Sequence, residues 1–157
     1  MYSFLIKYYA IYQCKILHIM ENYQISDIVF KLYLYADMTK MIHYTTDSNH
    51  AHELCDTVRD TITDFADELA EQSFGYYGKP EYSSLRKLNA LTVKETNDLG
   101  ELCKYATEIV DSLKTEFSKV EKLSGLVSLI DDYKGKMSKN VFLCSFDKVS
   151  NYKFKND

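Results

Sequence analysis

Hydrophobic positions recur at helical spacing in four stretches of the chain, separated by polar or glycine-containing segments. The first predicted helix runs from about Ser26, a residue type that caps helices, to about Tyr44. One side of this helix carries Ile28, Leu32, Tyr35 and Ile42, and the nearly opposite side carries Phe30, Leu34 and Met41. A helix that is apolar on two sides is usually buried on two sides.

A second helix is predicted from about His50 to Ser73, after the polar residues 45–49. Its apolar residues form one stripe: Leu54, Val58, Ile62, Phe65 and Leu69. The segment that follows contains Gly75, Gly78 and Pro80, and this composition predicts a loop.

Two further helices are predicted in the last third of the chain. Thr92 and Glu95 have the spacing of a capping box, which predicts the start of the third helix. Ser124 and Gly125 interrupt the apolar pattern before a fourth helix, which ends near Cys144. The third series is Leu99, Leu102, Ala106, Ile109, Leu113, Phe117 and Val120, and the fourth is Leu126, Leu129, Ile130, Tyr133, Met137, Val141 and Phe142.

Four amphipathic helices pack most simply as a bundle, so we expect an all-α fold with a longer loop between the second and third helices. The expected organisation is a bundle over residues 21–150, a short polar tail over residues 151–157 and a separate N-terminal segment over residues 1–20.

Residues 1–20 are apolar and rich in tyrosine, but Lys7 and Lys15 interrupt them. A signal peptide carries its charge before an unbroken apolar run, and a membrane span needs about 20 apolar residues without a central charge. We therefore expect an extra helix on the bundle, or an extension upstream of a start at Met20, and no membrane insertion.

Composition and charge argue against some classes of function. The 157 residues are 46% apolar and 27% charged, with a formal net charge of −4, whereas nucleic-acid binders need clustered Lys and Arg. A nucleic-acid partner is therefore not expected. The four cysteines show no CxxC pair, and we expect them to be reduced and mostly buried in a cytoplasmic protein.

The candidate chemistry lies on the second helix. With about 100° per residue and His52 at zero, Asp56 falls at about 40°, Asp67 at about 60° and Glu71 at about 100°. The apolar stripe of this helix centres near about 240°, so the polar stripe points away from the core. This face is either an ordinary solvated surface or a set of ligands that a second copy of the chain covers.

One chain alone cannot bring these ligands together. Asp56 and Asp67 are separated by roughly 16 Å along the helix axis, too far to share an ion. Two antiparallel copies would bring His52 and Asp56 of one chain beside Asp67 and Glu71 of the other, which creates two equivalent sites. The second apolar side of the first helix would then also be covered.

The series His43-Tyr44, then HELCD at residues 52–56, then DELAEQ at residues 67–72 resembles the ferroxidase signature of the Dps-type miniferritins. This resemblance implies a ferritin-like fold. It also implies that His43, His52 and Asp56 of one subunit bind metal together with Asp67 and Glu71 of its two-fold partner. The implied metal is iron, with manganese or zinc as alternatives, and no catalytic residue beyond the ligands and no organic cofactor is implied.

Three departures from the miniferritin pattern are visible. The turn between His43 and His52 is shorter than usual, Tyr44 replaces a tryptophan, and no lysine-rich DNA-binding tail is present. The short turn and the sequence GYYGKP look closer to an uncharacterised ferritin-like family of phage and bacterial genomes, from which no activity carries over.

The sequence gives less support to other catalytic arrangements. The chain contains no Glu-x-x-His pair, which argues against an iron centre inside one bundle. A nucleophilic or zinc arrangement of Cys55 with His43, His50 and His52 is possible in sequence, but Cys55 flanks the apolar stripe and is better interpreted as a core residue.

Two functional hypotheses follow. In the first, the chain is a homodimer or higher oligomer that binds and oxidises Fe(II), a ferroxidase. In the second, it is a helical interaction or structural protein that keeps the bundle without the metal chemistry, with a phage genome as one source to consider.

Overall fold

The computed structural model describes the backbone of residues 2–80 and 91–148 and the side chains of residues 24–80 and 91–146. Within these residues all regular secondary structure is helical. The elements in chain order are α1 (Tyr2–Thr45), α2 (Asn49–Tyr77), α4 (Leu99–Glu108), α5 (Asp111–Phe117), a 3-10 turn (Glu121–Leu123), α6 (Ser124–Cys144) and a last 3-10 turn (Ser145–Lys148). The predicted tail over residues 151–157 lies outside the described residues.

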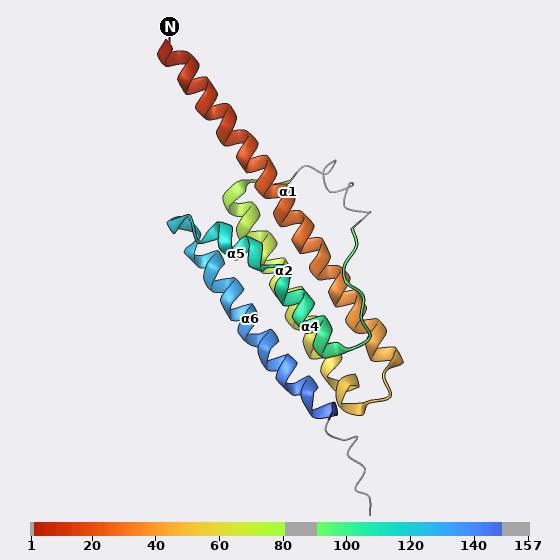
Figure 1. Ribbon diagram of the computed structural model, residues 1–157. Coiled ribbons are helices and arrows are strands. Elements are labelled where there is room, and N and C mark those ends of the chain that lie inside the picture. Colours follow the sequence, from red (N-terminus) through yellow and green to blue (C-terminus); the bar gives the residue numbers. More distant parts are fainter. Residues whose placement is uncertain (1, 81–90, 149–157) are drawn as a thin grey trace, which may run out of the picture.

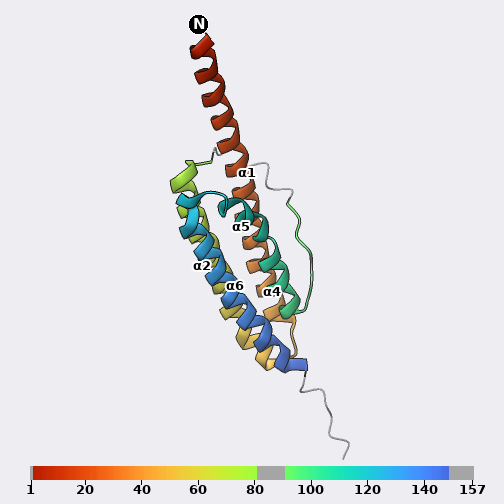
Figure 2. The same cartoon turned by 60° about the vertical axis from the view of Figure 1, so that its left-hand side comes forward.

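The helices form four rods that lie side by side: α1, α2, α4 continued by α5, and α6 (Figures 1 and 2). The N-terminal part of α1 extends past the ends of the other rods in both views. The prediction of an all-α bundle is therefore confirmed at the level of four packed rods.

The first helix begins much earlier than the sequence pattern indicated. α1 spans 44 residues from Tyr2, so Ser26 is not an N-cap but a buried residue within the helix. Its two apolar sides have different surroundings. Ile28, Leu32, Tyr35 and Ile42 are buried, whereas Phe30, Leu34, Met41 and also Tyr44 are exposed in the single chain.

A short connection turns the chain from α1 into α2. The Ser48 side chain caps α2 by accepting a hydrogen bond of 3.0 Å from the Ala51 N–H, and the helix ends at Gly78, which has a φ of 90°. Such a φ is strained for any residue with a Cβ, so glycine is the natural terminator here. The loop after α2 therefore begins at Gly78.

The third rod is interrupted. The N-cap of α4 is Asp98, whose carboxylate accepts the Glu101 N–H at 2.9 Å, so the predicted start at Thr92 was wrong. The helix breaks after Glu108, where the Ile109 N–H to Tyr105 and Val110 N–H to Thr107 bonds lengthen to 3.3 and 3.4 Å. A short second helix, α5, completes the rod.

The core lies between the four rods, and the predicted stripe of α2 is buried along its whole length. The Phe65 ring stacks on the Tyr133 ring of α6 with centroids 3.9 Å apart, and the Tyr133 hydroxyl donates to the Ala106 carbonyl at 3.1 Å. Three cysteines, Cys55, Cys103 and Cys144, are buried, as predicted, and the side chain of the fourth, Cys14, lies outside the described residues.

The core can be probed with one substitution at two positions. Val58→Ala, at a fully buried site, is expected to lower the free energy of unfolding by about 1–3 kcal/mol, because it removes apolar area and leaves a cavity. Val120→Ala, where the valine is 39% exposed, is the matched control and should change stability little. Urea unfolding followed by circular dichroism measures both, and equal losses would contradict the described core.

Candidate metal centre

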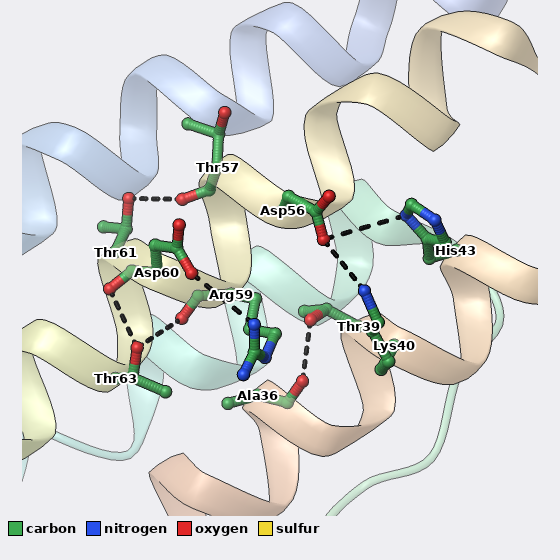
Figure 3. A network of polar contacts seen from close by, with 10 residues as sticks. All are labelled: Ala36, Thr39, Lys40, His43, Asp56, Thr57, Arg59, Asp60, Thr61 and Thr63. Atoms are coloured by element: carbon green, nitrogen blue, oxygen red, sulfur yellow. Dashed lines mark hydrogen bonds and ion pairs between the residues drawn. The ribbon is translucent and has the colours of Figure 1, made fainter.

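The turn between α1 and α2 brings three of the five predicted ligands together. The imidazole rings of His43 and His52 lie with their centroids 3.8 Å apart. Asp56, one turn further along α2, has its Oδ1 3.9 Å from Nδ1 of His43 (Figure 3). Two histidines and one carboxylate from two helices therefore form one cluster, which we call the His43 cluster.

His52 is held in a defined orientation. Its Nδ1 lies 3.1 Å from the carbonyl oxygen of His43. Because a carbonyl only accepts, Nδ1 is the donor and the neutral ring keeps its lone pair at Nε2. Histidines that bind metal commonly donate their other ring N–H to a carbonyl or carboxylate in this way.

His43 provides a test of whether the cluster fits a cation. Its Nδ1 is buried and has no hydrogen-bond partner, and the 3.9 Å to Asp56 is too long for a hydrogen bond. Two atoms that each bind one ion at about 2.1 Å lie within about 4.2 Å of each other. An orphaned nitrogen beside a carboxylate thus fits a shared divalent cation.

Lys40 lies beside the His43 cluster, although the sequence did not lead us to expect it there. Its Nζ lies 3.2 Å from Oδ1 of Asp56 and 5.5 Å from the centre of the Tyr44 ring. The hydrogen bond from Lys40 is the main cause that lowers the pKa of Asp56. The spacing in the sequence could have placed Lys40 near the site, since Lys40 precedes His43 by one helical turn and so lies on the same side of α1.

Asp67 and Glu71 lie apart from this cluster, further along the same side of α2. Asp67 accepts a short hydrogen bond from the hydroxyl of Tyr33 on α1. Burial, with the Asp67 carboxylate beside it, raises the pKa of Tyr33 to about 12, so this hydroxyl keeps its proton at neutral pH. Glu71 is exposed to solvent.

No group of three or more His, Cys, Asp or Glu side chains within the described part of the chain is arranged to hold a metal ion. His43, His52 and Asp56 lie close together but do not complete a metal site within one chain, and Asp67 and Glu71 lie at a distance from them.

The alternative arrangement around Cys55 is not formed. His50 turns toward α6, where its Nε2 lies 3.0 Å from the Leu143 carbonyl, and it caps the end of that helix. Cys55 is buried, and this burial raises its pKa to about 11, which disfavours the thiolate that a nucleophile or a zinc ligand needs. Cys55 is a core residue, as predicted.

Comparisons of the chain with protein-family models, with curated proteins and with solved structures gave no match. Among the described residues, no helix is long and apolar enough to cross a lipid bilayer.

The role of Lys40 can be measured without any metal. Lys40→Met is expected to raise the pKa of Asp56 toward the ordinary aspartate value, because the cation that favours the carboxylate is removed. In the wild type, the stability from this pair is present above the ordinary aspartate pKa and is lost as the pH falls through the lower folded value. Carboxyl ¹³C NMR over a pH series measures the shift.

Lys40→Arg keeps the charge and is the control for this measurement. An Asp56 pKa that stays the same in Lys40→Met would show that the ion pair does not form in solution.

Proposed function

We propose that this protein is a ferritin-like, cytoplasmic metal-binding protein whose site is shared between two subunits. The observation that carries the proposal is the His43 cluster, in which a buried, unpartnered imidazole nitrogen lies beside a carboxylate. Mixed imidazole and carboxylate ligands suit iron, manganese or zinc. Asp67 and Glu71 of the partner subunit would supply the remaining ligands.

The placement of the ligands on α2 supports a two-fold arrangement. His52 and Glu71 are equally far from the point between Thr61 and Ile62, and Asp56 and Asp67 share the same midpoint. A two-fold axis at this level would place each half of the ligand set opposite the other half. Two equivalent sites would form per dimer.

The exposed apolar residues of α1 are centred at nearly the same height along the bundle as this midpoint of α2, because Tyr33 pairs with Asp67 and Lys40 pairs with Asp56. Phe30 and Tyr44 each lie seven residues from Asp37, and Leu34 and Met41 lie on either side of it. In an antiparallel pair, Phe30 would meet Tyr44 and Leu34 would meet Met41. One axis therefore suits both the apolar residues and the ligands.

Contacts across the two helices join the apolar residues of α1 and the ligands of α2 into one surface. Tyr33 contacts the Phe30 ring, with centroids 6.4 Å apart, and donates to Asp67. Lys40 lies over the Tyr44 ring and binds Asp56. We call this surface, with Phe30, Leu34, Met41, Tyr44, His52, Asp56, Asp67 and Glu71, the α1–α2 face.

The charges of the α1–α2 face would be complementary in the dimer once a cation is bound. One end carries the two histidines and Asp56, whose charge Lys40 offsets, and the other end carries Asp67 and Glu71. An antiparallel pair would bring the two carboxylates of one copy to the His43 cluster of the other, where a divalent cation would supply the opposite charge. Asp37 lies at the level of the axis, where two carboxylates would oppose association.

The chain's own residues would prepare such a site in separate ways. His52 is oriented by its bond to the His43 carbonyl, and Lys40 holds Asp56 until a cation takes its place. Iron, when bound, would supply one-electron redox chemistry, which makes oxidation of Fe(II), with peroxide or dioxygen as the electron acceptor, the expected activity. Tyr44, exposed next to His43, is a tyrosine beside the proposed site.

One observation favours the second hypothesis, a helical interaction protein without metal chemistry. Lys40 already neutralises Asp56 in the single chain, and a fixed cation of this kind competes with a metal ion. The same α1–α2 face would then serve association alone, without any bound metal. Metal binding by the wild-type protein separates the two functions.

The shared site predicts complementation between two inactive variants. His52→Ala and Asp67→Ala, each alone, should abolish saturable Fe(II) binding in an anaerobic titration, because every site lacks one ligand. A purified heterodimer of the two variants keeps one site with both residues intact and should recover about half of the wild-type capacity. Heterodimers without any recovery would contradict a shared site.

The register of the dimer can be tested by exchanging charges. Leu34→Glu should shift the protein from dimer to monomer in sedimentation velocity, because it places a carboxylate against Met41 of the other copy. Adding Met41→Lys in the same chain should restore the dimer, since both contacts then pair unlike charges. The control is Leu34→Glu with Val120→Lys, outside the α1–α2 face, which should remain monomeric.

A further inference from the structure

We propose that Tyr33 is a positioning residue, which holds the carboxylate of Asp67 ready for a cation bound to the His43 cluster of the partner subunit. This inference rests on the proposed function and assigns a role to a residue outside its ligand set. The observation behind it is the hydrogen bond from the Tyr33 hydroxyl to Oδ1 of Asp67, which crosses from α1 to α2.

The hydrogen bond restricts a side chain that would otherwise be free to rotate. Asp67 is exposed on α2, and an exposed aspartate samples several rotamers, which costs entropy when it binds a ligand. Tyr33 is half-buried and its ring contacts Phe30 edge-on, so its hydroxyl is a fixed donor. The carboxylate is thus oriented before any cation arrives.

The bond leaves binding capacity on the carboxylate. A carboxylate has two oxygens with about four lone-pair positions, and the phenol occupies one of them. Oδ2 of Asp67 and the remaining positions stay available to a cation.

The two aspartates of the ligand set are held by different chemistry. Asp56 is bound by the charged ammonium of Lys40, whereas Asp67 is bound by a neutral hydroxyl. Both partners come from α1 and are seven residues apart, which is about two helical turns. The neutral donor orients Asp67 without cancelling its charge, so the Asp67 end of the α1–α2 face remains the anionic half of each site.

Tyr33→Phe tests this role because it removes only the hydroxyl and keeps the ring. The probe is Co(II), titrated anaerobically and followed by its visible d–d absorption. Outer-shell partners of ligands typically change metal affinity by about 10–100-fold, so the variant should bind Co(II) that much more weakly. Its thermal unfolding and its sedimentation should match the wild type. Tyr76→Phe, an exposed tyrosine near the end of α2, is the matched control and should bind like the wild type.

A second measurement addresses orientation without metal. Three-bond couplings report the χ1 rotamers of Asp67, which should be one rotamer in the wild type and an average in Tyr33→Phe. An averaged Asp67 in the wild type, or equal Co(II) affinity in wild type and Tyr33→Phe, would overturn the positioning role and leave the shared metal site standing. A wild type that does not bind Co(II) would overturn both proposals.

Discussion

The antiparallel pairing of α1 with α2 is the constraint on which the rest of the structure depends. Polar contacts tie the two helices together at three levels: His52 to the His43 carbonyl, Lys40 to Asp56, and Tyr33 to Asp67. Each contact forms only at one axial register of the two helices and at one rotation of each helix about its own axis. A shift of one residue would turn the contacting side chain by about 100° around the helix axis. Together with the buried stripe of α2, these contacts decide which residues meet at the surface.

The proposed site, divided between two subunits, would link metal binding to association. A cation that contacts both chains would bind only the dimer and would therefore stabilise it, and the dimer would in turn raise the affinity for the cation. The single chain already places the exposed apolar residues of α1 and the proposed ligands of α2 on one face. In the single chain, Lys40 supplies the counter-charge for Asp56.

The sequence predicted the parts of the fold that depend on residue type and spacing. The burial of the α2 stripe follows from helical periodicity. The second apolar side of α1, with Phe30, Leu34 and Met41, was expected to be buried but is exposed in the single chain, because periodicity identifies an apolar side and not what covers it. The start of α1 was missed because Ser26 was interpreted as an N-cap, although no glycine or proline breaks the chain between Tyr2 and Ser26. The break before α5 falls at Ile109 and Val110, which carry no turn signal. Tyr33 was missed because its contact with Asp67 crosses between helices, and one helix's pattern does not give the register of its neighbour. Lys40 could have been placed on the His43 side of α1 from its spacing, but its pairing with Asp56 depends on the same register.

The interruption of the third rod affects where local unfolding of the bundle begins. Short helices depend on tertiary packing for their stability, and α4 and α5 have only 10 and 7 residues, whereas α1 and α2 have 44 and 29. Local opening should therefore begin in the interrupted rod, as a cooperative unit of its own. The hairpin of α1 and α2, which carries all five proposed ligands, should be the last to exchange its amide hydrogens with solvent.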